Sequence, residues 1–290
     1  MIKYVAGLLL LIYDYAVLYL GLLWLGLLSL CWTLIATLLY PILPKAFAIR
    51  LGRYAIMLSF RAYLASLSAS GRCHFDLTEL DSLKYETSLI IAPNHPCLLD
   101  AVMIISRLPN VACVMKSELM NNVFLGAGAR LARYISNEPI RQMALEASED
   151  FKTGSHLLLF PEGTRTTHLP INALKGSIAL IAVKAQVPVQ TVLIETNSPY
   201  LSKGWSLFRK PTMPVSYKIT LGKRFEPPEN SHDFMLTLEQ YFLDALNPAS
   251  HQHELPTLMA SSANTHQVGM QNIIKNNASF GFNAKETTWS

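Results

Sequence analysis

The hydrophobic residues of this chain concentrate at its N-terminus. From Val5 to Leu43 the only charged residue is Asp14, and this stretch exceeds the about 20 residues that a helix needs to cross a bilayer. It is also too long for the apolar core of a secretory signal sequence. We expect a membrane anchor over residues 1–44, with a single span over about Tyr15–Tyr40. The alternative is a tight hairpin, or a pair of helices that enter the bilayer without crossing it.

Residues 45–70 change to an amphipathic pattern. At about 100° per residue, Arg50, Arg53 and Arg61 fall within one arc of roughly 80°, and apolar residues fill most of the remainder. Two interpretations stay open: a helix in the membrane interface with its arginines toward lipid phosphates, or an ordinary helix packed on a core. The basic residues that follow the apolar stretch place the rest of the chain on the cytosolic side in either case.

Beyond Gly71, short apolar runs alternate with longer amphipathic ones. The short runs predict strands and the amphipathic runs predict helices. The expected strands are Cys73–Leu77, Ser88–Ala92, Val111–Met115, His156–Phe160, Val189–Ile194 and Val215–Leu221, and the expected helices are Leu98–Arg107, Ile140–Lys152, Ala173–Ala185 and Asp233–Leu246. This alternation predicts an α/β domain, a mostly parallel sheet flanked by helices, over residues 71–248. Residues 249–290 are polar, and we predict a disordered tail there.

Composition narrows the classes of function. Only 15% of the residues are charged, and the net charge of +4 includes no block of Lys and Arg. We therefore expect no nucleic acid as a partner, whereas an anionic membrane surface suits this charge. The four cysteines form no CxxC pair, as in a reduced protein that faces the cytosol. His251 and His253 could bind a metal, but no acidic or Cys cluster accompanies them, so we expect an exposed tail and no metal site.

Candidate chemistry first appears in the string from Asn94 to Asp100, which follows a predicted strand. Side chains five residues apart point about 140° apart on one helix and cannot meet. They can meet if His95 lies on the loop that leaves the strand and Asp100 lies in the first turn of the next helix, a break that Pro96 favours. Asp100 would then hold one ring nitrogen of His95 and leave the other as a general base. Alone, an HxxxxD spacing is a weak signal, and Cys97 inside it is expected to be a buried small residue rather than a nucleophile.

A second polar string runs from Phe160 to Thr166, after another predicted strand. Gly163 permits a tight turn there, with Glu162 and Arg165 on either side, so that both side chains can enter one pocket. The planar guanidinium of Arg165 suits a phosphate. Glu162 would orient that arginine or bind an acceptor hydroxyl. The alternative is a salt bridge that only stabilises the turn.

Taken together, these strings resemble the lysophosphatidic acid acyltransferase family (1-acyl-sn-glycerol-3-phosphate acyltransferases), which belongs to the glycerolipid acyltransferases. Asn94, His95 and Asp100 match the family's NHxxxxD motif, and Phe160–Arg165 matches its FPEGTR motif. Lys116 begins a segment similar to the lysine-bearing stretch before the second motif. Val187-Pro188-Val189 resembles the fourth motif, and the resemblance covers about residues 85–225.

The resemblance implies a membrane-bound O-acyltransferase that moves an acyl chain from acyl-CoA or acyl-carrier protein to the free hydroxyl of a lysophospholipid. It implies His95 as the general base, Asp100 as its orienting partner, and no metal or other cofactor. The implied substrate-binding residues are Lys116, Glu162, Gly163, Thr164, Arg165 and Pro188, with Lys116 and Arg165 on the acceptor phosphate.

The second motif departs from the family pattern. The family usually carries an Ile-Asp-Arg-like string whose Arg helps to bind the acceptor phosphate, but Tyr134–Glu138 contains no Arg. Arg130, Arg133 or Arg141 would have to substitute, which leaves room for an acceptor other than plain lysophosphatidic acid.

Two other functions stay open. One is a hydrolase in which His95 activates water, although the sequence has no GxSxG nucleophile elbow to support it. The other is a non-catalytic membrane scaffold, which would not need His95 and Asp100 beside an intact FPEGTR string.

Overall fold

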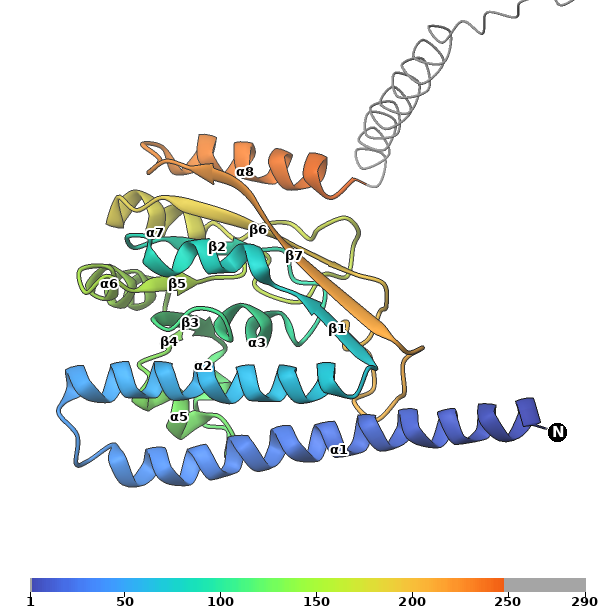
Figure 1. Ribbon diagram of the computed structural model, residues 1–290. Helices are drawn as coiled ribbons and strands as arrows, with labels where there is room; N and C mark the ends of the chain where they lie inside the picture. The colour runs from blue at the N-terminus through green and yellow to red at the C-terminus, as the bar shows by residue number, and fades with distance from the viewer. Residues whose placement is uncertain (1, 248–290) are drawn as a thin grey trace, which may run out of the picture. The chain divides into compact units, whose positions relative to one another are not determined.

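The computed structural model describes residues 2–247, so the tail predicted over residues 249–290 lies outside the described residues. Its centre is a seven-stranded sheet in the order β1-β7-β6-β2-β5-β3-β4 (Figure 1). The strands are β1 Cys73–Asp76, β2 Ile90–Pro93, β3 Val111–Met115, β4 Ile135–Ser136, β5 His156–Leu158, β6 Val189–Thr196 and β7 Val215–Phe225. Neighbouring strands pair in parallel, except that β6 and β7 are antiparallel. The predicted mostly parallel α/β sheet is therefore confirmed.

Helices surround this sheet and precede it. They are α1 Ile2–Leu39, α2 Lys45–Ala69, α3 Asp100–Ile105, α4 Ser117–Met120, α5 Gly126–Leu131, α6 Ile140–Phe151, α7 Ser177–Ala185 and α8 Ser231–Ala245, with a 3₁₀ helix at Thr78–Tyr85. α1 and α2 run side by side along one side of the domain and are joined by a short loop (Figure 1). The central strands have buried residues on both faces, which is why they appear in the sequence as short, uninterrupted apolar runs.

α1 packs along the α/β domain instead of standing free of it. It contacts both α2 and α5. The ring of Trp32 covers Gly128 of α5 so closely that a Cβ there would lie 2.7 Å from the ring. Thr33 Oγ1 donates a hydrogen bond of 2.8 Å to the Phe124 carbonyl. The apolar stretch forms one continuous helix, as expected for a single span and unlike the alternative of a hairpin within it. Whether this helix crosses the bilayer over Tyr15–Tyr40 stays a prediction, and the contacts show that one side of it packs on the protein.

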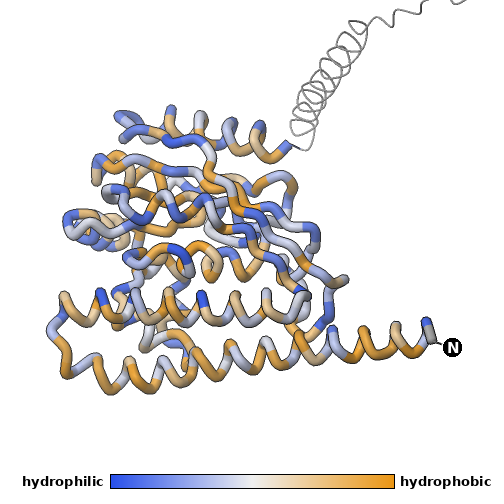
Figure 2. The backbone as a smooth tube through the Cα atoms, viewed as in Figure 1, coloured by the Kyte–Doolittle hydropathy of each residue, from blue (hydrophilic) through white to orange (hydrophobic). Residues whose placement is uncertain are grey.

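The opposite face of α1 is apolar and exposed, as the largely orange helix in Figure 2 shows. Its exposed side chains include Leu8, Leu9, Ile12, Leu20, Leu23, Trp24, Leu27, Leu34, Ile35 and Leu38. By length and composition, the helix from Lys3 to Leu39 could also cross a membrane. Exposed apolar surface of this extent indicates a binding face.

Asp14, the one charge in the apolar stretch, is turned toward the protein and is only 5% exposed. Its carboxylate pairs with Arg72 Nε at 2.7 Å and with Lys210 Nζ at 3.2 Å. A buried charge is tolerated when it is paired in this way. Asp14 thus attaches α1 to the chain just before β1 and to the loop between β6 and β7.

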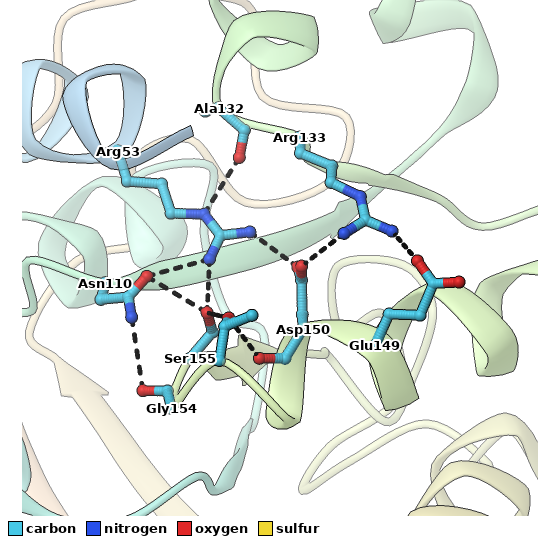
Figure 3. Close-up of polar contacts among 9 residues, drawn as sticks. Arg53, Asn110, Ala132, Arg133, Glu149, Asp150, Gly154 and Ser155 are labelled. Carbon is cyan, nitrogen blue, oxygen red and sulfur yellow. Dashed lines mark hydrogen bonds and ion pairs between the residues drawn. The ribbon is translucent and has the colours of Figure 1, made fainter. Parts of the chain in front are cut away.

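The three arginines of α2 do not share one environment, which favours the interpretation of this segment as a helix packed on the core. Arg50 is exposed, and Arg61 Nε donates to the Ser106 carbonyl at 3.1 Å. Arg53 is only 2% exposed, and its guanidinium lies inside the domain (Figure 3). It donates to the Ala132 carbonyl, Asn110 Oδ1, Ser155 Oγ and Asp150 Oδ2. The buried carboxylate of Asp150 needs a cation beside it, and Arg53 supplies one. Because this cation comes from α2, the helix is packed on the core.

Candidate active site

The sequence motifs gather at one edge of the sheet. β2, β5 and β3 are adjacent and parallel, so their carboxyl ends lie at the same edge. The string with His95 leaves β2, the string with Arg165 leaves β5, and Lys116 follows β3 directly. In open α/β sheets, ligands bind at this edge.

His95 and Asp100 meet as the sequence predicts, because His95 lies on the loop after β2 and Asp100 begins α3. His95 Nδ1 lies 2.7 Å from Asp100 Oδ2. Asp100 is fully buried, and burial raises the pKa of its carboxyl, an effect that hydrogen bonds from His95 and Cys97 partly offset. The His95 ring also stacks on Phe160, with ring centroids 3.9 Å apart. Its Nε2 makes no hydrogen bond within residues 2–247, so it is free to act as a base.

Asn94 explains why the loop before His95 is rigid. Its Nδ2 donates to the Ile194 carbonyl at 3.1 Å, and its Oδ1 accepts from the Ile194 N–H at 2.7 Å. An amide side chain offers one donor and one acceptor, like a peptide group, so Asn94 extends the pairing of β2 with β6 beyond the end of the strand.

Glu162 joins the two motifs and does not face a pocket. Its Oε1 accepts hydrogen bonds from the His95 N–H at 2.9 Å and Thr166 Oγ1 at 2.8 Å, and Oε2 accepts from the Asn172 N–H at 2.9 Å. Glu162 is 1% exposed, and it forms no ion pair with Arg165 in the described part of the chain. The carboxylate therefore connects the loops and does not contact Arg165. Its role as a substrate-binding residue stays a prediction.

Arg165 is half-buried and only partly engaged by the protein. Its Nη1 donates to the carbonyls of Leu201 and Ser202, at 2.8 and 3.0 Å. Nε and Nη2 have no protein partner within residues 2–247 and remain available to an anion. Thr164, beside it on the turn, is half-buried as well.

Gly163 makes the turn with φ +67°, and a Cβ there would lie 3.2 Å from Lys175 Cγ. The turn therefore needs glycine both for its backbone angle and for the side chain above it. Lys175 is an exposed cation at this turn that sequence reasoning did not single out as a site residue.

Lys116 is exposed at the start of α4. The neighbouring Asn137, where the resemblance leads one to expect Arg, accepts a hydrogen bond from the Ser117 N–H through its side chain. Of the suggested substitutes, Arg133 pairs with Glu149 and Asp150, and Arg130 donates to the Met120 carbonyl. Arg141 is exposed in the first turn of α6 and forms no ion pair among the described residues.

Pro188 lies at the opposite edge of the sheet. Its carbonyl accepts from the Ile90 N–H at the start of β2, whereas the Asn94 side chain beyond the end of β2 meets Ile194. With about 3.3 Å per residue, the length of a strand separates Pro188 from His95. Pro188 is therefore not beside His95, and its contact with a substrate stays a prediction.

The comparisons with known proteins agree with this geometry. A family model described as Acyltransferase matches residues 74–195. The 1-acyl-sn-glycerol-3-phosphate acyltransferase of Pseudomonas aeruginosa is 25% identical over 191 residues, which are 61% of this chain and 70% of that protein. The crystal structure of the 1-acyl-sn-glycerophosphate (LPA) acyltransferase PlsC from Thermotoga maritima gives a TM-score of 0.53 at 18% identity and covers 76% of this chain and 94% of that one. Residues 74–195 thus match an acyltransferase domain, and the chain is distantly similar in sequence to a 1-acyl-sn-glycerol-3-phosphate acyltransferase and in fold to a second one.

Proposed function

We propose that this protein transfers an acyl chain from a thioester, acyl-CoA or acyl-carrier protein, to the free hydroxyl of a lysophospholipid. The observation that supports this most strongly is the His95–Asp100 pair with Nε2 unoccupied at the motif-bearing edge of the sheet. The thioester already carries an activated acyl group, so a positioned base is the chief chemical requirement.

In the proposed reaction, His95 Nε2 accepts the proton of the acceptor hydroxyl while the hydroxyl oxygen attacks the thioester carbonyl. Asp100 stabilises the imidazolium that forms, because its Oδ2 receives the Nδ1 hydrogen. The tetrahedral intermediate then collapses, the C–S bond breaks, and the leaving thiolate takes the proton from His95. The products are an ester and a free thiol.

The acceptor's charged headgroup is assigned to cations at the same edge. Arg165 offers its free Nε and Nη2, and the exposed Lys116 follows the strand next to β5. Because Asn137 stands where the family usually has Arg, the headgroup contact here depends more heavily on these two side chains.

We further propose that the exposed apolar face of α1 contacts the bilayer, with the α/β domain on the cytosolic side. One loop supports the link between membrane and site. Lys210 of the β6–β7 loop pairs with Asp14 of α1, and Leu201 of the same loop accepts hydrogen bonds from Arg165 and from the Leu98 N–H. The β6–β7 loop thus contacts both α1 and Arg165, so a lipid acceptor in the bilayer beside α1 would lie near the proposed site.

The test is to incubate the purified protein in lipid vesicles with labelled acyl-CoA or acyl-carrier protein and a panel of lysophospholipids. Label in a diacyl product, absent with His95→Ala, is the expected result and names the acceptor. Free fatty acid alone, still dependent on His95, would indicate a hydrolase instead. If wild type and His95→Ala formed the same products in the same amounts with every donor and acceptor, the non-catalytic membrane scaffold would be the remaining function.

A further inference from the structure

Cys97 contacts the catalytic carboxylate twice. Its backbone N–H donates to Asp100 Oδ2 at 2.9 Å, and its thiol donates to Oδ1, also at 2.9 Å. Oδ2 also receives His95 Nδ1, so both oxygens of this fully buried carboxylate have a donor. The thiol is the only side-chain donor to Oδ1 in the described chain.

The surroundings keep this thiol protonated. Cys97 is 1% exposed, and burial together with the neighbouring Asp100 raises the pKa of the thiol well above its usual range. Burial also raises the pKa of the Tyr217 hydroxyl, with further contributions from Cys97 and Asp100. A protonated thiol is a poor nucleophile but can donate its hydrogen to a carboxylate.

We propose that Cys97 is a positioning residue for the His95–Asp100 pair. Its thiol and its backbone N–H fix the rotation of the Asp100 carboxylate so that Oδ2 faces His95 Nδ1. The role in catalysis rests on the proposed acyl transfer, whereas the effect on the hydrogen bond between His95 and Asp100 does not.

Removal of the thiol would leave Oδ1 buried without a donor. An unsatisfied charged acceptor in a dry site is costly, so removal of the thiol would favour the protonated form of Asp100 and raise its pKa further. A protonated Asp100 is a weaker acceptor for the Nδ1 hydrogen and no longer stabilises the imidazolium by its charge, so the tautomer with a free Nε2 is held less firmly. Activity should therefore fall first on the acidic side of the pH profile.

Three variants test this. Cys97→Ala removes the donor, Cys97→Ser keeps a donor of similar size, and Cys113→Ala removes another buried thiol, on β3, as a matched control. If Cys97→Ala does not fold, Cys97→Val replaces it because it fills more of the buried volume. For each variant, kcat and KM for acyl transfer are measured across pH, and the tautomer of His95 is read from ¹⁵N chemical shifts.

We expect Cys97→Ala to lower kcat about 10- to 100-fold, with KM nearly unchanged and the acidic limb moved to higher pH. Cys97→Ser and Cys113→Ala should stay within about threefold of wild type, since neither removes a donor to Asp100. An unchanged pH profile and His95 tautomer in Cys97→Ala, or an equal loss in Cys97→Ser, would overturn the proposal. If wild type transfers no acyl group at all, the proposed function fails, and the ¹⁵N shifts alone still decide the role of Cys97.

Discussion

Replacing Arg53 by methionine tests whether the buried network of Figure 3 attaches α2 to the α/β domain. The variant loses the ion pair with Asp150 and three further hydrogen bonds, to Ala132, Asn110 and Ser155. Removing one partner of a buried ion pair typically costs 3–5 kcal/mol. Asp150 keeps Arg133 Nη1 at 3.1 Å, so its charge is not left unpaired. We therefore expect the free energy of unfolding to fall by about 3 kcal/mol, the lower end of that range.

The assay is urea unfolding in detergent micelles, followed by tryptophan fluorescence. Arg50→Met is the matched control, because Arg50 is exposed on the same helix and its loss should cost less than about 0.5 kcal/mol. Asn110 and Ser155 precede β3 and β5, so the network lies at the strand edge away from His95, and kcat of the folded variant should be unchanged. A cost for Arg53→Met within about 1 kcal/mol of that for Arg50→Met would refute the reasoning, since it would mean that the network contributes little net stability.

Asp100→Asn should abolish transfer yet raise the melting temperature. Burial raises the pKa of Asp100, so the charged form destabilises the fold increasingly as pH rises above the ordinary aspartate range, and the gain should be larger at neutral pH than near the ordinary pKa of aspartate. Gly163→Ala should cost about 1 kcal/mol or more, because of its positive φ and the contact with Lys175, and should lower activity, as chemical denaturation and the transfer assay would show. Asp14→Leu leaves Arg72 and Lys210 without their shared counter-charge, and faster proteolysis in the loop between α1 and α2 would report a loosened helix.

The strands were predictable where burial on both faces produces an apolar run, and Val111–Met115 agrees residue for residue. α4, α5 and the two-residue β4 were not predicted. α5 is short and begins with Gly126-Ala127-Gly128, a composition that does not favour a helix. Its formation depends on close approach, since Cβ atoms at the two glycines would collide with the Met120 carbonyl and Trp32. Such contacts are tertiary and leave no periodic signal in the sequence.

The geometry of His95 and Asp100 was predictable because Pro96 disfavours a helical conformation at His95. The helix therefore begins only after the loop that carries His95. The roles of Arg53 and Glu162 were not predictable. Arg53 meets Asp150, and Glu162 meets the backbone of His95, across long sequence separations that no local pattern encodes. The position of Pro188 was not predictable for a related reason. Motif similarity does not say which end of a strand a residue occupies, and Pro188 precedes β6 whereas His95 follows β2.

The two motifs act as one unit around the base. The His95 N–H donates to Glu162 Oε1, and the His95 carbonyl accepts from the Thr166 N–H at 2.7 Å, so the FPEGTR turn holds the backbone of His95 on both sides. The ring is held separately, by Asp100 at Nδ1 and by Phe160 through stacking. In the proposed acyl transfer, a base fixed at backbone and ring would lose little freedom when the acceptor binds, which would lower the entropic part of the barrier. The FPEGTR string would therefore serve that reaction through the position of Nε2, even where its residues touch no substrate.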